Sequence, residues 1–104
     1  MKAKKTFEIL WDESAGKELK NLLKEIQVKS EPLSKKIKNG ILEKLLQASK
    51  FPLSFEKDQL KVRNSGNHRK IHEIHIRIAY KIDNRKKVIK IIRVKHSSSE
   101  PIKY

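Results

Sequence analysis

The segment from Ile74 to Ile82 alternates isoleucine or tyrosine with polar or small residues, and this alternation constrains the fold more than any other feature of the chain. A period of two residues is typical of a strand that buries one face. The polar stretch 83–86 then leads into a second apolar run at 87–95. We therefore predict two antiparallel strands joined by a short turn.

The first half of the chain has a different period. Residues 7–11 alternate as a short strand does, but after Asp12 the apolar residues recur at helical spacing. Asp12 suits the N-cap of a first helix. A second helix is predicted to begin at Ser30, because Pro32 fits the first turn of a helix, and to end before Pro52. The two predicted apolar stripes are Ala15, Leu19, Leu22, Leu23 and Ile26, and Ile37, Ile41, Leu42, Leu45 and Leu46.

The segment between the helices and the alternating strand completes the expected topology. Leu60 and Val62 predict a short basic strand, and the residues 64–67 have the composition of a turn. The predicted order is β-α-α-β-β-β, in a single α+β domain spanning residues 1–104. Both helices need an apolar surface to cover, so we expect a two-helix hairpin on one face of an antiparallel-rich sheet. The other face of the sheet is expected to be open to solvent.

The charge of the chain indicates an anionic partner. Lys and Arg number 26 against 12 Asp and Glu, which gives a formal net charge of +14 and a pI near 10.1. Such a field concentrates polyanions, so RNA or an RNA–protein machine is the favoured partner. We also expect a separate acidic protein that neutralises this charge. The alternative is that the excess of lysine reflects the composition of the source organism.

Several other classes of function are excluded or disfavoured by the sequence. The chain has no cysteine, so we expect neither a disulfide scaffold nor a thiolate metal site. The four histidines show no metal-ligand spacing, and no glycine-rich phosphate loop occurs, so no metal and no cofactor is predicted. The start MKAKKTFEIL lacks the apolar stretch of a signal peptide, and a cytoplasmic protein without membrane contact is expected.

A group of cationic residues, with one terminal tyrosine, falls on or near the predicted strands. We interpret it as an RNA cradle in which Arg and Lys hold phosphates and a His or Tyr moves protons. The alternative is a solvated basic face that only meets an acidic partner, with Arg77 bonding across strands. The members are Lys61, Arg63, Arg69, Lys70, His72, His75, Arg77, Arg93, Lys95, His96 and Tyr104.

The last third of the chain resembles a known family. The segment IHIRIAYKIDNRKKVIKIIRVKHSSSEP, followed by IKY, is similar to the C-terminal half of RelE/ParE toxins. In those toxins an Arg-hydrophobic-x-Tyr strand is followed by a turn, an apolar strand and a segment with His or Arg. The corresponding elements here are Arg77, Tyr80, the strand Ile89–Val94, His96, Pro101 and Tyr104. The order of elements in the N-terminal half also fits this family.

The resemblance implies a toxin of a type II toxin–antitoxin module with one of two activities. RelE-like members cleave mRNA on the ribosome without metal, through attack of a 2′-hydroxyl, whereas ParE-like members poison DNA gyrase. Both are silenced by an antitoxin, which we expect here to be acidic. For the nuclease branch the resemblance implies catalytic roles for Arg77, His96, Tyr104 and Lys70. Phosphate contacts are expected from Lys61, Arg63, Arg69, His75, Arg93 and Lys95.

One departure from the nuclease pattern means that the sequence alone does not decide between the nuclease and its alternatives. The segment Ser97, Ser98 and Ser99 stands where the nuclease branch often has a basic residue. Removal of such a charge lowers a rate by about 10²–10³, although His96 is able to carry a proton near neutral pH. A ribosome-dependent endoribonuclease therefore remains the favoured hypothesis. A gyrase inhibitor, and an inactive relative that binds only its antitoxin, are the alternatives.

Overall fold

The structure, a computed structural model, describes residues 6–104. Its elements follow the order β1 (Glu8–Trp11), α1 (Glu13–Lys29), α2 (Glu31–Lys50), the 3₁₀ turn η1 (Pro52–Ser54), β2 (His68–Glu73), β3 (Ile76–Asp83) and β4 (Val88–His96). The predicted order β-α-α-β-β-β and the α+β class are confirmed. The first five residues of the predicted domain 1–104 lie outside the described residues.

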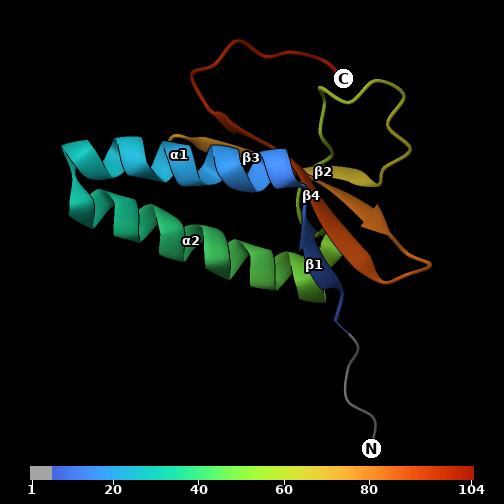
Figure 1. Cartoon of the computed structure of the whole chain (residues 1–104). Helices are drawn as coiled ribbons and strands as arrows, with labels where there is room; N and C mark the ends of the chain where they lie inside the picture. The colour runs from blue at the N-terminus through green and yellow to red at the C-terminus, as the bar shows by residue number, and fades with distance from the viewer. Residues whose placement is uncertain (1–5) are drawn as a thin grey trace, which may run out of the picture.

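The helices form the predicted antiparallel hairpin, and local side chains explain where each begins and ends (Figure 1). Asp12 stands at the N-cap of α1, but its carboxylate accepts a hydrogen bond from the Ser14 hydroxyl at 2.7 Å instead of from the helix backbone. Ser30 caps α2, because its hydroxyl oxygen accepts from Leu33 N at 3.2 Å. The helix ends at Lys50, two residues before Pro52.

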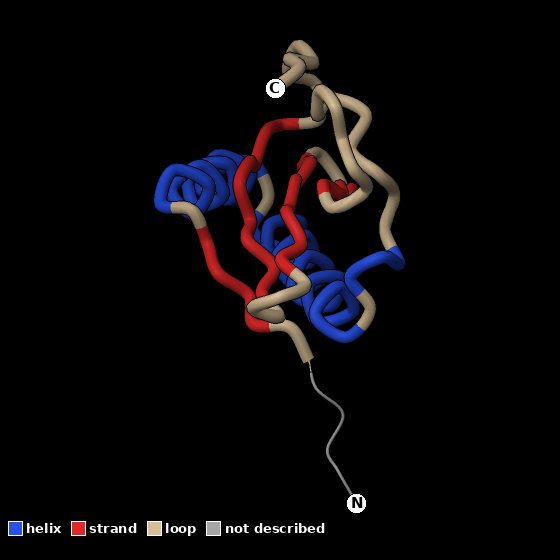
Figure 2. The backbone as a smooth tube through the Cα atoms, turned by 90° about the vertical axis from the view of Figure 1, so that its right-hand side faces the viewer, coloured by secondary structure: helices blue, strands red, loops and turns tan. Residues whose placement is uncertain are grey.

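A four-stranded mixed sheet covers one side of this hairpin. The strand order is β1-β4-β3-β2, with β1 parallel to β4 and the other neighbours antiparallel. Both helices pack on the same face, α1 mainly against β4 and α2 against β1 and β2 (Figures 1 and 2). A β-bulge between β3 and β4 leaves Ile92 as an extra residue beside the pair Tyr80 and Ile91. Within residues 6–104, neither α1 nor α2 covers the opposite face of the sheet, as predicted.

The buried rows of the sheet follow from the register of the strands. Residues that pair across neighbouring strands point to the same face of a sheet. One set of rows is buried beneath the helices: Ile71, Ile78 and Val94; Tyr80 and Ile91; Ile82 and Ile89. The alternate rows therefore define the opposite, open face.

The second strand was predicted in the wrong place. Leu60 and Val62 lie in turns and not in a strand, and β2 begins only at His68. Likewise Ile74 and His75 form the turn between β2 and β3. The sequence HRKIHE of β2 conceals the strand because it offers only one apolar residue to the helix side.

Polar residues occupy the other inward positions of β2, and each has a partner. The Arg69 guanidinium donates to the Gly66 and Phe55 carbonyl oxygens at 2.7 and 3.0 Å. The Glu73 carboxylate pairs with Lys44 at 2.7 Å. These hydrogen bonds and this ion pair satisfy the polar side chains at positions where apolar residues ordinarily alternate in a strand.

Candidate nucleic-acid interface

Three rows of mostly cationic side chains cross the open face of the sheet. Each row takes one residue from β2, one from β3 and one from β4, in register, so the side chains of a row are neighbours on one surface. We call this surface the basic face. Its rows are His72, Arg77 and Lys95; Lys70, Ala79 and Arg93; and His68, Lys81 and Lys90.

The first row carries the residue pattern of a phosphate site. Arg77 lies on the central strand β3, half-buried between the exposed side chains of His72 and Lys95. A guanidinium binds phosphate through a planar fork of donors. Arg77 is therefore neither sealed in the interior nor bonded only across strands, and it is approachable from solvent.

Two histidines of the basic face are held neutral near pH 7. Partial desolvation of the His72 ring, which is otherwise exposed, lowers its pKa below 6.5, and the charges of Lys70 and Arg77 lower it further. Burial also lowers the pKa of His68, with Lys61 and Lys81 acting in the same direction. A neutral imidazole among cations is able to accept a proton from a bound hydroxyl.

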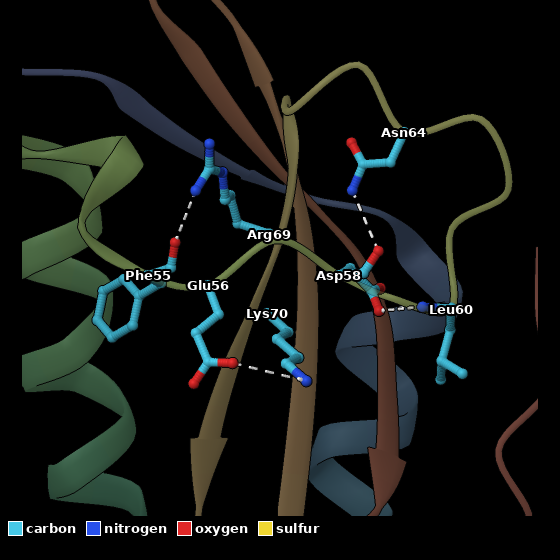
Figure 3. Close-up of polar contacts among 7 residues, drawn as sticks. All are labelled: Phe55, Glu56, Asp58, Leu60, Asn64, Arg69 and Lys70. Atoms are coloured by element: carbon cyan, nitrogen blue, oxygen red, sulfur yellow. Dashed lines mark hydrogen bonds and ion pairs between the residues drawn. The ribbon is translucent and has the colours of Figure 1, made fainter.

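Lys70 meets one acidic side chain at the edge of the face. Its ammonium lies 3.9 Å from a carboxylate oxygen of Glu56, which is 78% exposed, so the pair is weak in water (Figure 3). Glu56 belongs to the segment before β2 that runs beside that strand, since Lys70 N donates to Glu56 O at 2.9 Å. An anionic ligand is thus able to displace Glu56 and pair with Lys70.

Tyr104 lies at one corner of the basic face. Its ring lies 4.3 Å from the Arg93 guanidinium and 5.7 Å from the Lys61 ammonium. The hydroxyl donates to Asp58 Oδ2 at 2.5 Å. Burial, and then the hydrogen bond to Asp58, raise the pKa of the phenol well above its usual range. In this arrangement the Tyr104 hydroxyl is occupied and is not free to transfer a proton to a ligand.

The structure brings together only part of the predicted site. Lys70, Arg77, Arg93 and Lys95 share the basic face, with Lys61 and Tyr104 at its edge. Arg69 points to the helix side, where its guanidinium donates to the Gly66 carbonyl and to the Phe55 carbonyl, the second of which Figure 3 shows. Arg63 is exposed in the loop before β2.

His75 and His96 lie at another end of the sheet. His96 pairs with Ile76, a buried residue of the helix-side rows, so it faces away from Arg77. Its ring stacks on His75 at 5.7 Å, beside Lys29 of α1. His96 Nδ1 also accepts a hydrogen bond from Ser98 N at 3.0 Å. These two histidines therefore do not join the row that contains Arg77.

Sequence reasoning missed Asp58, His68, Lys81 and Lys90. His68 was hidden because the register of β2 was unknown. Lys81 and Lys90 lie on β3 and β4, and only the pairing of the strands brings them into one row with His68. Asp58 carries no signal in the sequence, since one aspartate in a polar loop is ordinarily exposed. The structure buries it to 3% exposure.

Within residues 6–104, no three His, Asp or Glu side chains gather as ligands of one metal ion would. In the same residues, no helix is both long and apolar enough to cross a membrane.

Among known protein families, the one described as the ParE toxin of the type II toxin–antitoxin system, parDE, matches residues 9–101 of this chain. No curated protein sequence matches the chain. Similar solved structures include the RelBE2 toxin–antitoxin complex of Mycobacterium tuberculosis, with a TM-score of 0.60 at 18% identity, covering 95% of this chain and 100% of that chain.

Two structures of the Escherichia coli toxin RelE are also similar. The free state of a double-arginine mutant has a TM-score of 0.59 at 20% identity, covering 89% of this chain and 85% of that chain. The same mutant in complex with an antitoxin RelB peptide has a TM-score of 0.56 at 21% identity, covering 90% of this chain and 86% of that chain. At these identities the likeness shows a shared fold.

Proposed function

The chain belongs to the RelE/ParE family of toxins of type II toxin–antitoxin systems, and from this premise we propose that it is an endoribonuclease that cuts mRNA on the ribosome. The observation that carries the proposal is the row His72, Arg77 and Lys95 on a face of the sheet that no helix covers. The row combines a neutral base, a phosphate-binding fork and a second cation on adjacent strands.

The proposed chemistry needs no metal. His72 takes the proton from a ribose 2′-hydroxyl, whose oxygen then bonds to the adjacent phosphorus while the bond from phosphorus to the 5′-oxygen breaks. Arg77 and Lys70 stabilise the extra negative charge at phosphorus. Lys95, on the far side of Arg77 from His72, donates a proton to the leaving 5′-oxygen. The products are a 2′,3′-cyclic phosphate and a free 5′-hydroxyl.

The remaining cations would bind substrate outside the cleaved bond. Arg93 lies in the row next to that of Arg77, and Lys81 and Lys90 lie in the row beyond it. With Lys61, which lies beside Tyr104, these cations suit neighbouring phosphates. Few exposed aromatic residues are available to stack bases, which favours a substrate held in shape by the ribosome. We also propose a cytoplasmic location, where that substrate is found.

The proposed partner is an acidic antitoxin encoded with the toxin. The similar structures of RelBE2 and of RelE with a RelB peptide are toxin–antitoxin complexes. The net charge of +14 favours a partner rich in Asp and Glu, whose contact with the basic face would weaken as salt is added.

The first test is Arg77→Ala during controlled expression in bacteria. Expression of the wild-type chain should arrest growth and leave new mRNA 5′ ends within codons, mapped by primer extension. Loss of the Arg77 charge should lower cleavage by about 10²–10³ and restore growth. Arg85→Ala is the matched control, because Arg85 is exposed in the turn between β3 and β4 and should leave both readouts unchanged.

A second candidate function is inhibition of DNA gyrase. Two observations favour it: the matching family is described as ParE, and the Ser97–Ser99 segment beside β4 supplies no cation to the basic face. Under this alternative, growth arrest is accompanied by double-strand DNA breaks and intact mRNA. That combination would remove the nuclease proposal.

A further inference from the structure

Asp58 is an unusual residue in so basic a chain. Of the charged side chains in residues 6–104, it alone is fully buried, at 3% exposure. Within the same residues, no Lys, Arg or His forms an ion pair with it. Burial of a carboxylate without an ion partner destabilises a fold unless hydrogen bonds satisfy its oxygens.

Both carboxylate oxygens of Asp58 have hydrogen-bond partners. Oδ1 accepts from Leu60 N at 3.0 Å, and Oδ2 accepts from the Tyr104 hydroxyl at 2.5 Å (Figure 3 shows the first contact). The backbone of Asp58 is fixed as well, since its amide donates to His68 O at 2.9 Å and its carbonyl accepts from Asn64 Nδ2 at 3.1 Å. Hydrogen bonds therefore fix Asp58 in the loop before β2, beside His68, the first residue of that strand.

The segment that ends in Tyr104 is tied to the same loop by its backbone. Tyr104 N donates to Leu60 O at 2.8 Å, and Val62 N donates to Tyr104 O at 2.5 Å. Arg93 holds the segment from the sheet, through a hydrogen bond to Ile102 O at 3.0 Å and through the Tyr104 ring. Figures 1 and 2 show the C-terminal segment beside the loop that precedes β2.

We propose that Asp58 is a positioning residue, which fixes Tyr104 against Arg93 and so sets the shape of one corner of the basic face. The Tyr104 hydroxyl is then an anchor, and the ring and the Arg93 guanidinium are the parts presented to RNA. The effect on cleavage rests on the proposed nuclease function, whereas the fixing of Tyr104 does not.

The test uses Asp58→Asn, Tyr104→Phe and the double variant in the full chain. Asparagine keeps the shape of Asp58 and removes its charge, and phenylalanine removes only the hydroxyl. Asp83→Asn is the matched control, because Asp83 is the last residue of β3 and its carboxylate accepts from Lys86 N, in the turn that follows, at 3.0 Å.

The first readout is amide hydrogen exchange, which needs no enzymatic activity. The Val62 and Tyr104 amides should exchange about 10- to 100-fold faster in Asp58→Asn and Tyr104→Phe, because a hydrogen bond to a charged group is lost. The Ile78 amide in the centre of the sheet reports whether the fold is intact, and it should not change. Equal protection of Val62 and Tyr104 in all variants would overturn the proposal.

The second readout is the ionisation of Tyr104, followed by phenolate absorbance. Asp58→Asn should lower the pKa of Tyr104 toward the ordinary value of about 10, since the anionic acceptor is gone. A purely structural effect elsewhere in the fold would leave the pKa of Tyr104 unchanged. An unchanged titration would also contradict the proposal.

The third readout separates the two proposals. With ribosome-bound mRNA, Asp58→Asn should lower kcat more than it raises KM, and it should have no further effect in the Tyr104→Phe background. Equal losses from Asp58→Asn in both backgrounds would overturn the positioning role. A wild-type chain that cuts no RNA, while exchange and titration still respond, would remove the nuclease function and support the fixing of Tyr104.

Discussion

His72 is the residue whose protonation the proposed reaction depends on. Partial burial and the neighbouring charges of Lys70 and Arg77 lower its pKa from 6.5, so at a given pH a larger fraction of it is neutral than of a free imidazole. A base must be neutral to accept a proton, and cleavage should therefore fall as the pH decreases through the lowered pKa of His72. In kcat/KM measured against pH, the acidic midpoint should lie below 6.5.

The variant His72→Asn tests this assignment. It should remove the acidic midpoint and lower cleavage by about 10²–10⁴. His75→Asn is the matched control, because His75 lies in the turn between β2 and β3 and faces away from the Arg77 row. A pH profile that survives His72→Asn unchanged would assign the base elsewhere.

The same pKa shift gives stability a pH dependence of known sign. A histidine whose pKa is lowered in the folded state binds more protons when unfolded. The free energy of unfolding should thus decrease as the pH falls below the unfolded value of 6.5, with contributions from His68 and His72. Urea unfolding at several pH values measures this, and His72→Asn should flatten the dependence.

The sequence could predict some site residues because a strand turns alternate side chains to one face. The alternation around Arg77 puts it on the face opposite Ile76 and Ile78, which are buried. In β4 the alternation alone would put Arg93 and Lys95 on the same face as Ile89 and Ile91, and only the β-bulge at Ile92 turns the two cations to the open face. The position of His75 could not be predicted in this way, because a turn at residues 74–75, with a φ of +66° at His75, ends the alternation of β3. His96 continues the alternation of β4 and follows Val94 to the helix side of the sheet.

Among the elements, strand β2 is the one that the periodicity of the sequence could not predict. Its inward positions are held by Arg69, Ile71 and Glu73, two of which are charged. Each charged residue is satisfied by a specific contact with a distant part of the chain, and such pairing leaves no periodic signal. The helical hairpin, by contrast, was predicted with its bounds because its caps and stripes are local in sequence. Leu42 and Leu46 of the predicted second stripe are nevertheless exposed.

The contact between α2 and β2 predicts a large effect of one methyl group. A Cβ added at Gly40 would lie 2.6 Å from Glu73 Oε1, and Glu73 is held in place by Lys44. Gly40→Ala should therefore destabilise the fold by about 1–3 kcal/mol, although alanine is the better helix former. Thermal or urea unfolding measures the change.

Gly16 in α1 is the matched control for this prediction. A Cβ there meets no atom within 4 Å, so Gly16→Ala should stabilise the fold by about 0.5–1 kcal/mol. If both variants were equally stabilising, Glu73 would be free to move away, and the close packing of α2 on β2 would not constrain the sheet edge.

At the scale of the whole molecule, the net charge of +14 attracts RNA whatever surface binds it, so affinity alone cannot locate the interface. The salt dependence of binding is more informative, because each phosphate contact with a single strand adds about 0.7 to the slope of log K against log salt. Lys81 and Lys90 are exposed neighbours in one row of the basic face. Lys20 and Lys24 are exposed on α1, beside the groove between the two helices.

Two double variants with the same change in net charge therefore distinguish local contact from the general field. Lys81→Gln with Lys90→Gln should reduce the salt slope for a non-cleavable 2′-O-methyl RNA by about 1.4. Lys20→Gln with Lys24→Gln should leave that slope nearly unchanged, because the helices lie on the opposite side of the sheet. Fluorescence anisotropy between low and physiological salt measures both slopes. Equal slopes for the two variants would mean that RNA is attracted by the net charge of the protein and that the basic face has no special part in binding it.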